Sequence, residues 1–186
     1  MVKLPCIETE RLRLRPFNLE DSKEVQRLAG DVEIAKTTLN IPHPYEDGMA
    51  EEWISRHAEA YEKGISLTLA ITDKEEKYLI GAVGLIINKD HNRAELGYWI
   101  GKPYWNKGYC TEAAKALCDY GFQEIGLNKI CATHLKRNPA SGKVMQKIGM
   151  EEEGVFREHV KKWGKYEDLV YYGIFRNTVS EEWNEL

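Results

Sequence analysis

A glycine-containing turn between a strand and a helix is the feature that most constrains what this chain can fold into. The alternation of residues 93–100 predicts a strand, and residues 111–125 carry apolar side chains at helical spacing up to Gly126. Between them, Gly108 allows close approach of the backbone to a ligand, and Lys107 adds a positive charge. The first N–H groups of a helix lack backbone acceptors and lie at the positive end of its dipole. This junction therefore predicts a pyrophosphate site.

The spacing of this turn differs from that of other nucleotide motifs. The chain contains neither GxxxxGK[ST] nor GxGxxG, so neither a P-loop nor a dinucleotide-binding fold is predicted. A glycine before a helix is by itself a weak signal, because every helix needs a start and most helices bind no anion.

The remaining periodicities predict a mixed order of strands and helices. A mostly antiparallel sheet flanked by helices, an α+β sandwich, accommodates this order. Because no linker rich in Pro, Gly or Ser divides the chain, residues 1–186 are expected to form a single domain. Further strands are expected at 7–16, 66–72, 78–87, 129–136, 155–161 and 168–175, and further helices at 18–29, at 47–63 and from 139 to Gly149.

Asparagines mark the expected starts of two helices. Asn18, with Asp21 three residues later, predicts an N-cap. Asn138 and Pro139 stand at the N-cap and first helical positions of the helix that Gly149 ends. Both helices are therefore expected to begin with a side-chain cap.

Composition limits the class of protein and its partners. The 186 residues are 42% hydrophobic and 30% charged, which is typical of one globular domain. A net charge of −4 argues against nucleic acid and anionic membranes as partners. No secretory signal and no apolar run near the roughly 20 residues of a membrane span is present. The four cysteines lie far apart without a CxxC pair, so we expect reduced thiols, no zinc site and a cytoplasmic protein.

The turn itself, Trp-Asn-Lys-Gly-Tyr-Cys at 105–110, resembles the acetyl-CoA signature of the GNAT superfamily of N-acetyltransferases. The core pattern of that signature is Gln/Arg-x-x-Gly-x-Gly/Ala, from which Trp105 and Cys110 depart at the first and last positions. The longer segment 104–113 is similar to the form used by the RimJ/RimL-type branch, the ribosomal-protein N-terminal acetyltransferases. The resemblance extends over nearly the whole chain, through segments at 7–15, 138–150 and 166–171.

This resemblance implies the GNAT fold, whose central sheet is splayed at an acetyl-CoA cleft. It also implies acetyl-CoA as cosubstrate, with no metal, and a backbone N–H near Trp99 and Ile100 that stabilises the oxyanion. The residues that it implies for acetyl-CoA binding are Trp99, Ile100, Lys107, Gly108, Tyr109, Cys110, Thr111 and Asn138.

Acetyl transfer to an amine needs a base for the ammonium proton and an acid for the departing thiolate. Glu95, on the strand before the turn, is the expected base, with His134 or water as alternatives. Many GNAT enzymes protonate the thiolate with a tyrosine of the penultimate helix, but Met145 stands there and a thioether cannot donate a proton. The RimJ/RimL-type resemblance implies that Ser141 takes this role.

The acceptor is expected to be a primary amine that is acetylated directly, by resemblance a protein N-terminal α-amine such as that of a ribosomal protein. Packing at the helix start explains Cys110 better than a covalent acetyl-enzyme does. Two alternatives stay open, namely acetylation of a polyamine or aminoglycoside, and a non-catalytic acyl-CoA-binding or ribosome-associated module. We expect no direct contact with nucleic acid or membrane, and a monomer or homodimer.

Overall fold

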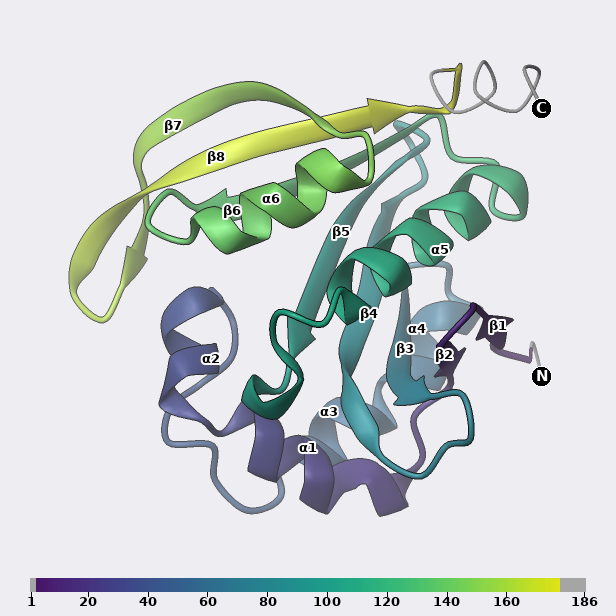
Figure 1. Ribbon diagram of the computed structural model, residues 1–186. Helices are drawn as coiled ribbons and strands as arrows, with labels where there is room; N and C mark the ends of the chain where they lie inside the picture. Colours follow the sequence, from purple (N-terminus) through teal and green to yellow (C-terminus); the bar gives the residue numbers. More distant parts are fainter. Residues whose placement is uncertain (1–2, 178–186) are drawn as a thin grey trace.

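Eight strands form one sheet through the molecule (Figure 1). The computed structural model describes residues 3–177. The strands are β1 (Ile7–Glu8), β2 (Leu12–Arg15), β3 (Ser66–Asp73), β4 (Leu79–Asn88), β5 (Arg93–Ile100), β6 (Lys129–Leu135), β7 (Glu151–Lys162) and β8 (Lys165–Phe175). Their spatial order is β1-β2-β3-β4-β5-β6-β8-β7, and every neighbouring pair is antiparallel except β5 and β6.

Helices cover both faces of this sheet. They are α1 (Ser22–Ala29), α2 (Val32–Thr37), α3 (Met49–Ser55), α4 (His57–Glu62), α5 (Tyr109–Gln123) and α6 (Pro139–Lys147), with 3₁₀ turns at Leu19–Asp21 and Lys102–Tyr104. α5 and α6 pack on one face, whereas α1, α3 and α4 lie on the other (Figure 1). The predicted α+β class and the mostly antiparallel sheet are confirmed.

The sheet opens between β5 and β6. These strands pair only at Arg93 with Lys129, and at the next two residues of each strand, ending with Glu95 opposite Cys131. Beyond this point β5 continues to Ile100 against β4 alone, and β6 continues against β8 alone. The predicted splay is therefore present, and one edge of each strand is left without a strand partner.

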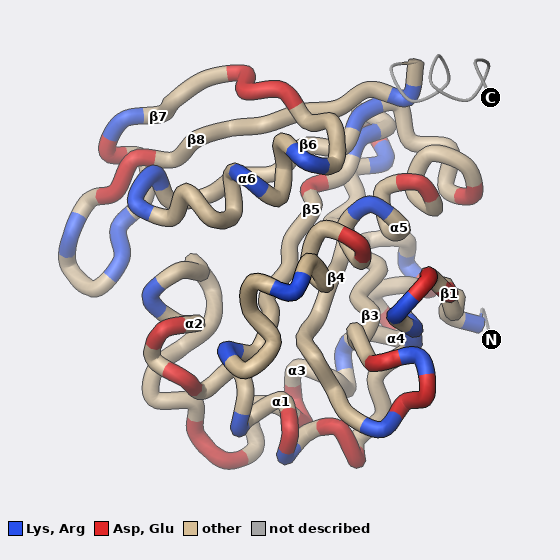
Figure 2. The backbone as a smooth tube through the Cα atoms, in the orientation of Figure 1, with Lys and Arg blue, Asp and Glu red and all other residues tan. Residues whose placement is uncertain are grey.

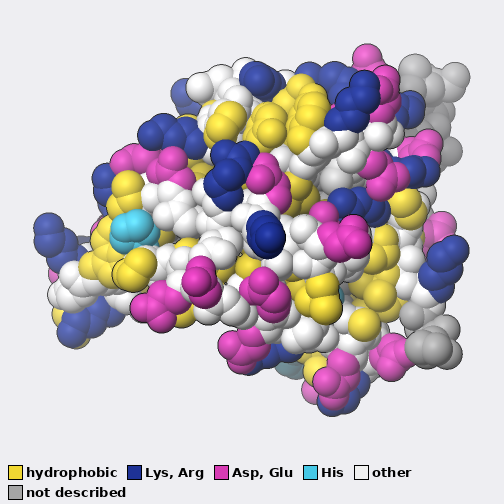
Figure 3. All heavy atoms as spheres, turned by 90° about the horizontal axis from the view of Figure 1, so that it is seen from below, with side chains coloured by type: hydrophobic (Ala, Val, Ile, Leu, Met, Phe, Trp, Pro, Cys, Tyr) yellow, Lys and Arg dark blue, Asp and Glu magenta, His cyan; other side chains and the backbone are white. Residues whose placement is uncertain are grey.

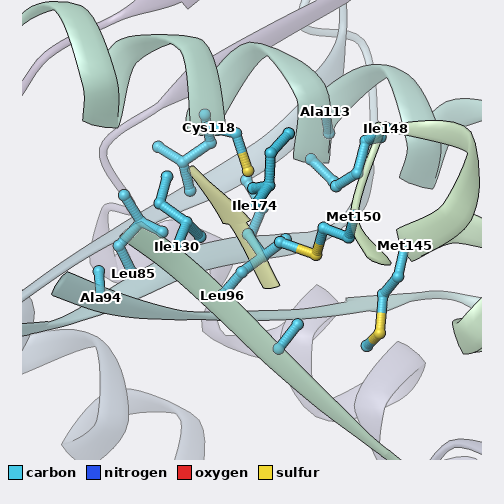
Figure 4. Packing of buried hydrophobic residues seen from close by; sticks show 14 of the residues in the cluster. Leu85, Ala94, Leu96, Ala113, Cys118, Ile130, Met145, Ile148, Met150 and Ile174 are labelled. Atoms are coloured by element: carbon cyan, nitrogen blue, oxygen red, sulfur yellow. The ribbon is translucent and has the colours of Figure 1, made fainter. Parts of the chain in front are cut away.

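The main hydrophobic core lies between the sheet and α5 (Figure 4). Leu85, Leu96 and Ile130 of the sheet are at most 3% exposed. A Cβ atom on Gly121 of α5 would lie 3.1 Å from the side chains of Leu85 and Ile130, so glycine permits the close approach of helix and sheet. Each buried aliphatic side chain contributes about 1.5–3 kcal/mol to stability. This packing fixes α5, and with it the turn at its N-terminus, against β5.

Two predicted elements are interrupted in the structure, and one helix is present that was not predicted. The strand expected at 7–16 is interrupted, because Thr9 Oγ1 accepts a hydrogen bond from the Leu12 N–H and closes a turn between β1 and β2. The helix expected at 47–63 is divided into α3 and α4 next to Ser55, whose hydroxyl donates to the Glu52 carbonyl, a contact that bends helices. Helix α2 was not predicted, since its six residues are too short to show a periodicity.

The two predicted N-caps have different outcomes. Asn18 accepts a hydrogen bond from the Asp21 N–H, and the Asp21 carboxylate accepts one from the Asn18 N–H, so this cap is confirmed. Asn138 stands at the N-cap position of α6, but its side chain makes no capping bond. Its amide instead donates to the carbonyl of Thr37 at 3.3 Å, which ties α6 to the end of α2.

His57 is packed in an aromatic cluster without a hydrogen-bond partner. Its ring centroid lies 4.5 Å from that of Trp53 and 5.5 Å from that of Phe17. Neither imidazole nitrogen has a partner among the described residues. Burial lowers the pKa of His57 from 6.5 to about 4. The folded protein therefore keeps this ring neutral at a pH where the unfolded chain protonates it.

The His57→Phe variant is expected to lose less stability than the parent protein in mild acid. The contribution of neutral His57 is complete above pH 6.5 and is lost as the pH falls toward about 4, because only the unfolded chain takes up the proton. Thermal unfolding at several pH values should show a fall in Tm that is smaller by about 4 °C in the variant. The exposed His91 serves as the control in His91→Gln, and equal pH slopes in His57→Phe and the parent would contradict the interpretation.

Candidate active site

Helix α5 begins in the turn that the sequence singles out. Gly108 has a φ of 80°, a left-handed conformation that favours glycine, and Asn106 has a φ of 61°. No side chain caps this end of α5. The N–H groups of Tyr109, Cys110 and Thr111 therefore lie in the uncapped first turn and can bind an anionic ligand. This is the backbone arrangement of an anion-binding site.

The end of β5 lies along the open side of the splay. The N–H of Gly101 donates to the Ile80 carbonyl of the neighbouring β4 side. Since backbone N–H groups alternate along a strand, the Ile100 N–H points away from β4, toward the opening. The Trp105 indole donates to the Ile100 carbonyl at 2.6 Å, which anchors the following turn to the strand.

Tyr98 and Ser141 meet across the opening. Tyr98 belongs to β5 and Ser141 to the first turns of α6. The Tyr98 hydroxyl donates to the Ser141 carbonyl at 3.1 Å and lies 3.0 Å from Ser141 Oγ, in a contact where either oxygen can be the donor. Burial raises the pKa of Tyr98, so its hydroxyl keeps its proton at neutral pH.

Sequence reasoning did not connect Tyr98 with Ser141. Tyr98 packs with the α5 core, on the face of the sheet opposite Glu95. The two-residue alternation of β5 separates it from Glu95 and could have placed it there. Its pairing with α6 is a contact over 43 residues of sequence and leaves no local signal.

Glu95 lies at the last residue pair before the splay and is exposed. Its Oε1 accepts a hydrogen bond of 3.3 Å from Thr133 Oγ1 of β6. Among residues 3–177 no cation forms a salt bridge with Glu95, and the nearby Arg93 donates to the Tyr171 hydroxyl instead. The carboxylate is therefore accessible to an amine from the face opposite α5.

His134 points toward α6, on the face opposite Glu95. Its Nδ1 lies 2.8 Å from the carbonyl oxygen of Leu135, and the ring is 9% exposed. A Cβ atom on Gly142 would lie 2.7 Å from His134 Nε2, so the ring fits against α6 only where that helix carries glycine. This geometry explains His134 by packing.

Cys110 and Met145 are explained by packing as well. Burial raises the pKa of the Cys110 thiol to about 12, which keeps it protonated at neutral pH and poorly nucleophilic. Met145 is 1% exposed and extends into the core beneath α6 (Figure 4). Neither side chain is available for proton transfer in the cleft.

The segment after α2 is tied to two other elements. Besides the contact of Asn138 with Thr37, Lys162 of β7 donates from Nζ to the Leu39 carbonyl at 3.2 Å. Lys162 is only 7% exposed, and burial lowers its pKa. The end of α2 and the first residues after it are thereby held beside α6 and the β7–β8 hairpin.

Basic residues around the cleft are mostly paired with acidic ones. Lys136 lies 3.3 Å from Asp168, and Arg137 lies 2.8 Å from Glu167. Figure 2 shows acidic and basic segments following each other along β7 and β8. On the underside of the molecule, where α1 lies, side chains of both signs are also interspersed (Figure 3). Lys107 is exposed, and its Nζ lies 5.7 Å from the centre of the Tyr104 ring.

Residues 3–177 contain neither a metal centre nor a membrane-spanning helix. No group of three His, Cys, Asp or Glu side chains there is arranged to hold a metal ion. No helix of that part of the chain combines the length and the apolar character that crossing a bilayer demands.

A family model and related proteins show which kind of enzyme this chain is similar to. A family model described as an acetyltransferase (GNAT) domain matches residues 11–151. The Bacillus subtilis (strain 168) protein YdaF, named provisionally as a ribosomal N-acetyltransferase, is 31% identical over 92% of this chain and 94% of its own.

Two solved structures are similar over nearly their whole length. A GNAT-family acetyltransferase from Bacillus anthracis has a TM-score of 0.83 and 29% identity, over 93% of this chain and 99% of its own. A spermidine N-acetyltransferase from Vibrio cholerae, solved with CoA and spermine, has a TM-score of 0.78 and 25% identity, over 91% and 98%. Since the family model spans the splayed strands, the uncapped turn and α6, the chain belongs to the GNAT family and is an acetyl-CoA-dependent N-acetyltransferase.

Proposed function

We propose that this enzyme acetylates the N-terminal α-amine of a protein, such as a ribosomal protein. The observation that carries the proposal is the position of Glu95, an exposed carboxylate without a salt bridge among the described residues, at the point where the sheet opens. The similarity to YdaF supports the same class of acceptor.

The surroundings of Glu95 favour a peptide over a polyamine. A polyamine carries further ammonium groups that need carboxylates, but Arg93 lies on the same face of β5 as Glu95, and the acidic residues of β8 are engaged in ion pairs. A peptide carries amide groups, which can hydrogen-bond to the strand edges that the splay leaves free. The similarity to a spermidine N-acetyltransferase keeps the polyamine as the second candidate.

In the proposed mechanism, Glu95 removes the proton from the ammonium of the acceptor, directly or through a water. The neutral amine attacks the thioester carbonyl, so that a C–N bond forms; as the C–S bond breaks, the nitrogen releases its second proton to water. The Ile100 N–H, at the end of β5 beside Trp99, donates to the oxyanion. Ser141 protonates the departing thiolate, and Tyr98 orients the Ser141 hydroxyl and can replace its proton.

The uncapped turn of α5 is proposed to hold the cosubstrate. The N–H groups of residues 108–111 bind the pyrophosphate, and the exposed Lys107 adds a positive charge. Asn138 keeps its side-chain oxygen available for an amide N–H of the pantetheine arm, because its contact with Thr37 uses only the NH₂ group.

The acceptor is tested by following thiol release with peptides that have a free N-terminus, the same peptides with a blocked N-terminus and an internal lysine, spermidine, and an aminoglycoside. We expect turnover on free N-termini and none on blocked peptides. Turnover confined to spermidine or the aminoglycoside would contradict the proposal. Binding of acetyl-CoA without turnover on any amine would favour a non-catalytic module.

Ser141→Ala is expected to lower kcat about 100-fold, the size of a general-acid contribution, while the Kd for acetyl-CoA stays the same. Tyr98→Phe is expected to lower kcat about tenfold, because it removes the partner that orients Ser141. Both variants are assayed by thiol release and by titration with acetyl-CoA. Ser55→Ala, in an exposed position of α3, is the control and should keep full activity. An unchanged kcat in Ser141→Ala would remove this residue from the role.

Glu95→Gln is expected to lower kcat/KM about 100-fold near neutral pH, because the ammonium form of the acceptor cannot attack. The deficit should shrink as the pH rises from about 6.5 to about 9.5, since an N-terminal amine with a pKa of about 8 then loses its proton without help. The measurement is the pH dependence of kcat/KM for parent and variant. A deficit that stays constant over this range would show that Glu95 does not act as the base.

A further inference from the structure

A carboxylate stands next to the expected phosphate site. Glu112 lies in the first turn of α5, directly after residues 109–111, whose N–H groups are proposed to bind the pyrophosphate. A negative charge stabilises the N-terminus of a helix, but here it also repels the phosphates of the cosubstrate. The enzyme therefore needs a way to compensate Glu112.

The turn between β1 and β2 provides this compensation. Glu112 Oε1 accepts hydrogen bonds from Thr9 Oγ1 at 2.6 Å and from the Arg11 backbone N–H at 2.9 Å. Its Oε2 accepts one from Arg11 Nε at 2.7 Å. Burial alone would raise the pKa of Glu112, but these hydrogen bonds and the Arg11 charge outweigh it and lower the pKa. Glu112 is thus held in its ionised form, and the charge of Arg11 compensates its negative charge.

Arg11 also contacts the phosphate-binding turn itself. Its Nη1 donates to the Lys107 carbonyl at 2.9 Å, and its guanidinium carbon lies 4.9 Å from the centre of the Tyr109 ring. Its Nη2 is the atom that a Cβ on Gly108 would meet, at 3.3 Å. One guanidinium therefore touches the turn at three consecutive residues. The side chain remains 46% exposed beside the turn.

We infer that Arg11 is a positioning residue for the phosphates of acetyl-CoA, because it fixes the carbonyl side of the turn and cancels the charge of Glu112. With the Lys107 carbonyl bound to Arg11, the turn presents its N–H groups to the ligand. With Glu112 neutralised, the N-terminus of α5 keeps its attraction for an anion. Thr9 supports the same arrangement through its bond to Glu112.

The test is a double-mutant cycle that measures the Kd for acetyl-CoA by calorimetry without any amine, so its outcome is independent of the proposed acceptor. Arg11→Ala is expected to raise Kd about tenfold, the loss of a charge-assisted contact. In the Glu112→Gln background, Arg11→Ala should raise Kd only about threefold or less, because the carboxylate that Arg11 compensates is gone. An equal loss in both backgrounds would overturn the inference.

A phosphate-free substrate separates positioning of phosphates from general damage to the fold. With S-acetylpantetheine, Arg11→Ala should keep the parent value of kcat/KM, whereas a loss as large as with acetyl-CoA would overturn the inference. Arg13→Ala is the matched control: Arg13 pairs with Glu8 and Glu76, away from the turn, so its Kd should equal that of the parent.

Arg11→Lys covers the case in which Arg11→Ala fails to fold. Lysine keeps the charge near Glu112 but cannot bond both that carboxylate and the Lys107 carbonyl in a fixed fork. Its Kd for acetyl-CoA should lie between those of the parent and of Arg11→Ala, or about threefold above the parent. A parent-like Kd would contradict the need for the fork.

Discussion

Between β5 and β6 the sheet is held by three residue pairs, and the cleft depends on where that pairing stops. After Glu95 and Cys131, each strand remains attached to its other neighbour, so the opening does not unfold either half of the sheet. The backbone groups along the two free edges have no strand partners. A ligand with amide groups can satisfy them, and this is the chemistry of a pantetheine arm and of a peptide.

The opening also connects the two faces of the sheet. The alternation of β5 places Glu95 on one face and Tyr98, with its partner Ser141, on the other. In a continuous sheet a layer of backbone would separate the expected base from the expected acid. Because the strands diverge between them, an amine that approaches from the side of Glu95 can meet the thioester that the proposed mechanism places on the side of α5 and α6.

The packing of α5 against the sheet fixes the position of its N-terminal turn. Its small residues, among them Gly121, pack directly on β4 and β6, and the Trp105 indole ties the turn back to β5. On the other side, Arg11 and Thr9 attach the turn to the beginning of the chain. The proposed phosphate site is thus held from the strand before it, from the sheet beneath it and from a segment about 100 residues away in sequence.

The sequence by itself determined the α+β class, the strands at 66–72 and 93–100, the glycine turn and the helix after it, because each depends on local periodicity or on a single residue's backbone freedom. It also pointed to Glu95 and Ser141 as candidates. Only the tertiary structure decided that Tyr98 bonds to Ser141, that Asn138 holds Thr37 rather than capping α6, and that Arg11 clamps Glu112. These contacts join residues from separate elements, and side-chain pairing between distant segments leaves no pattern along the chain from which it could be predicted.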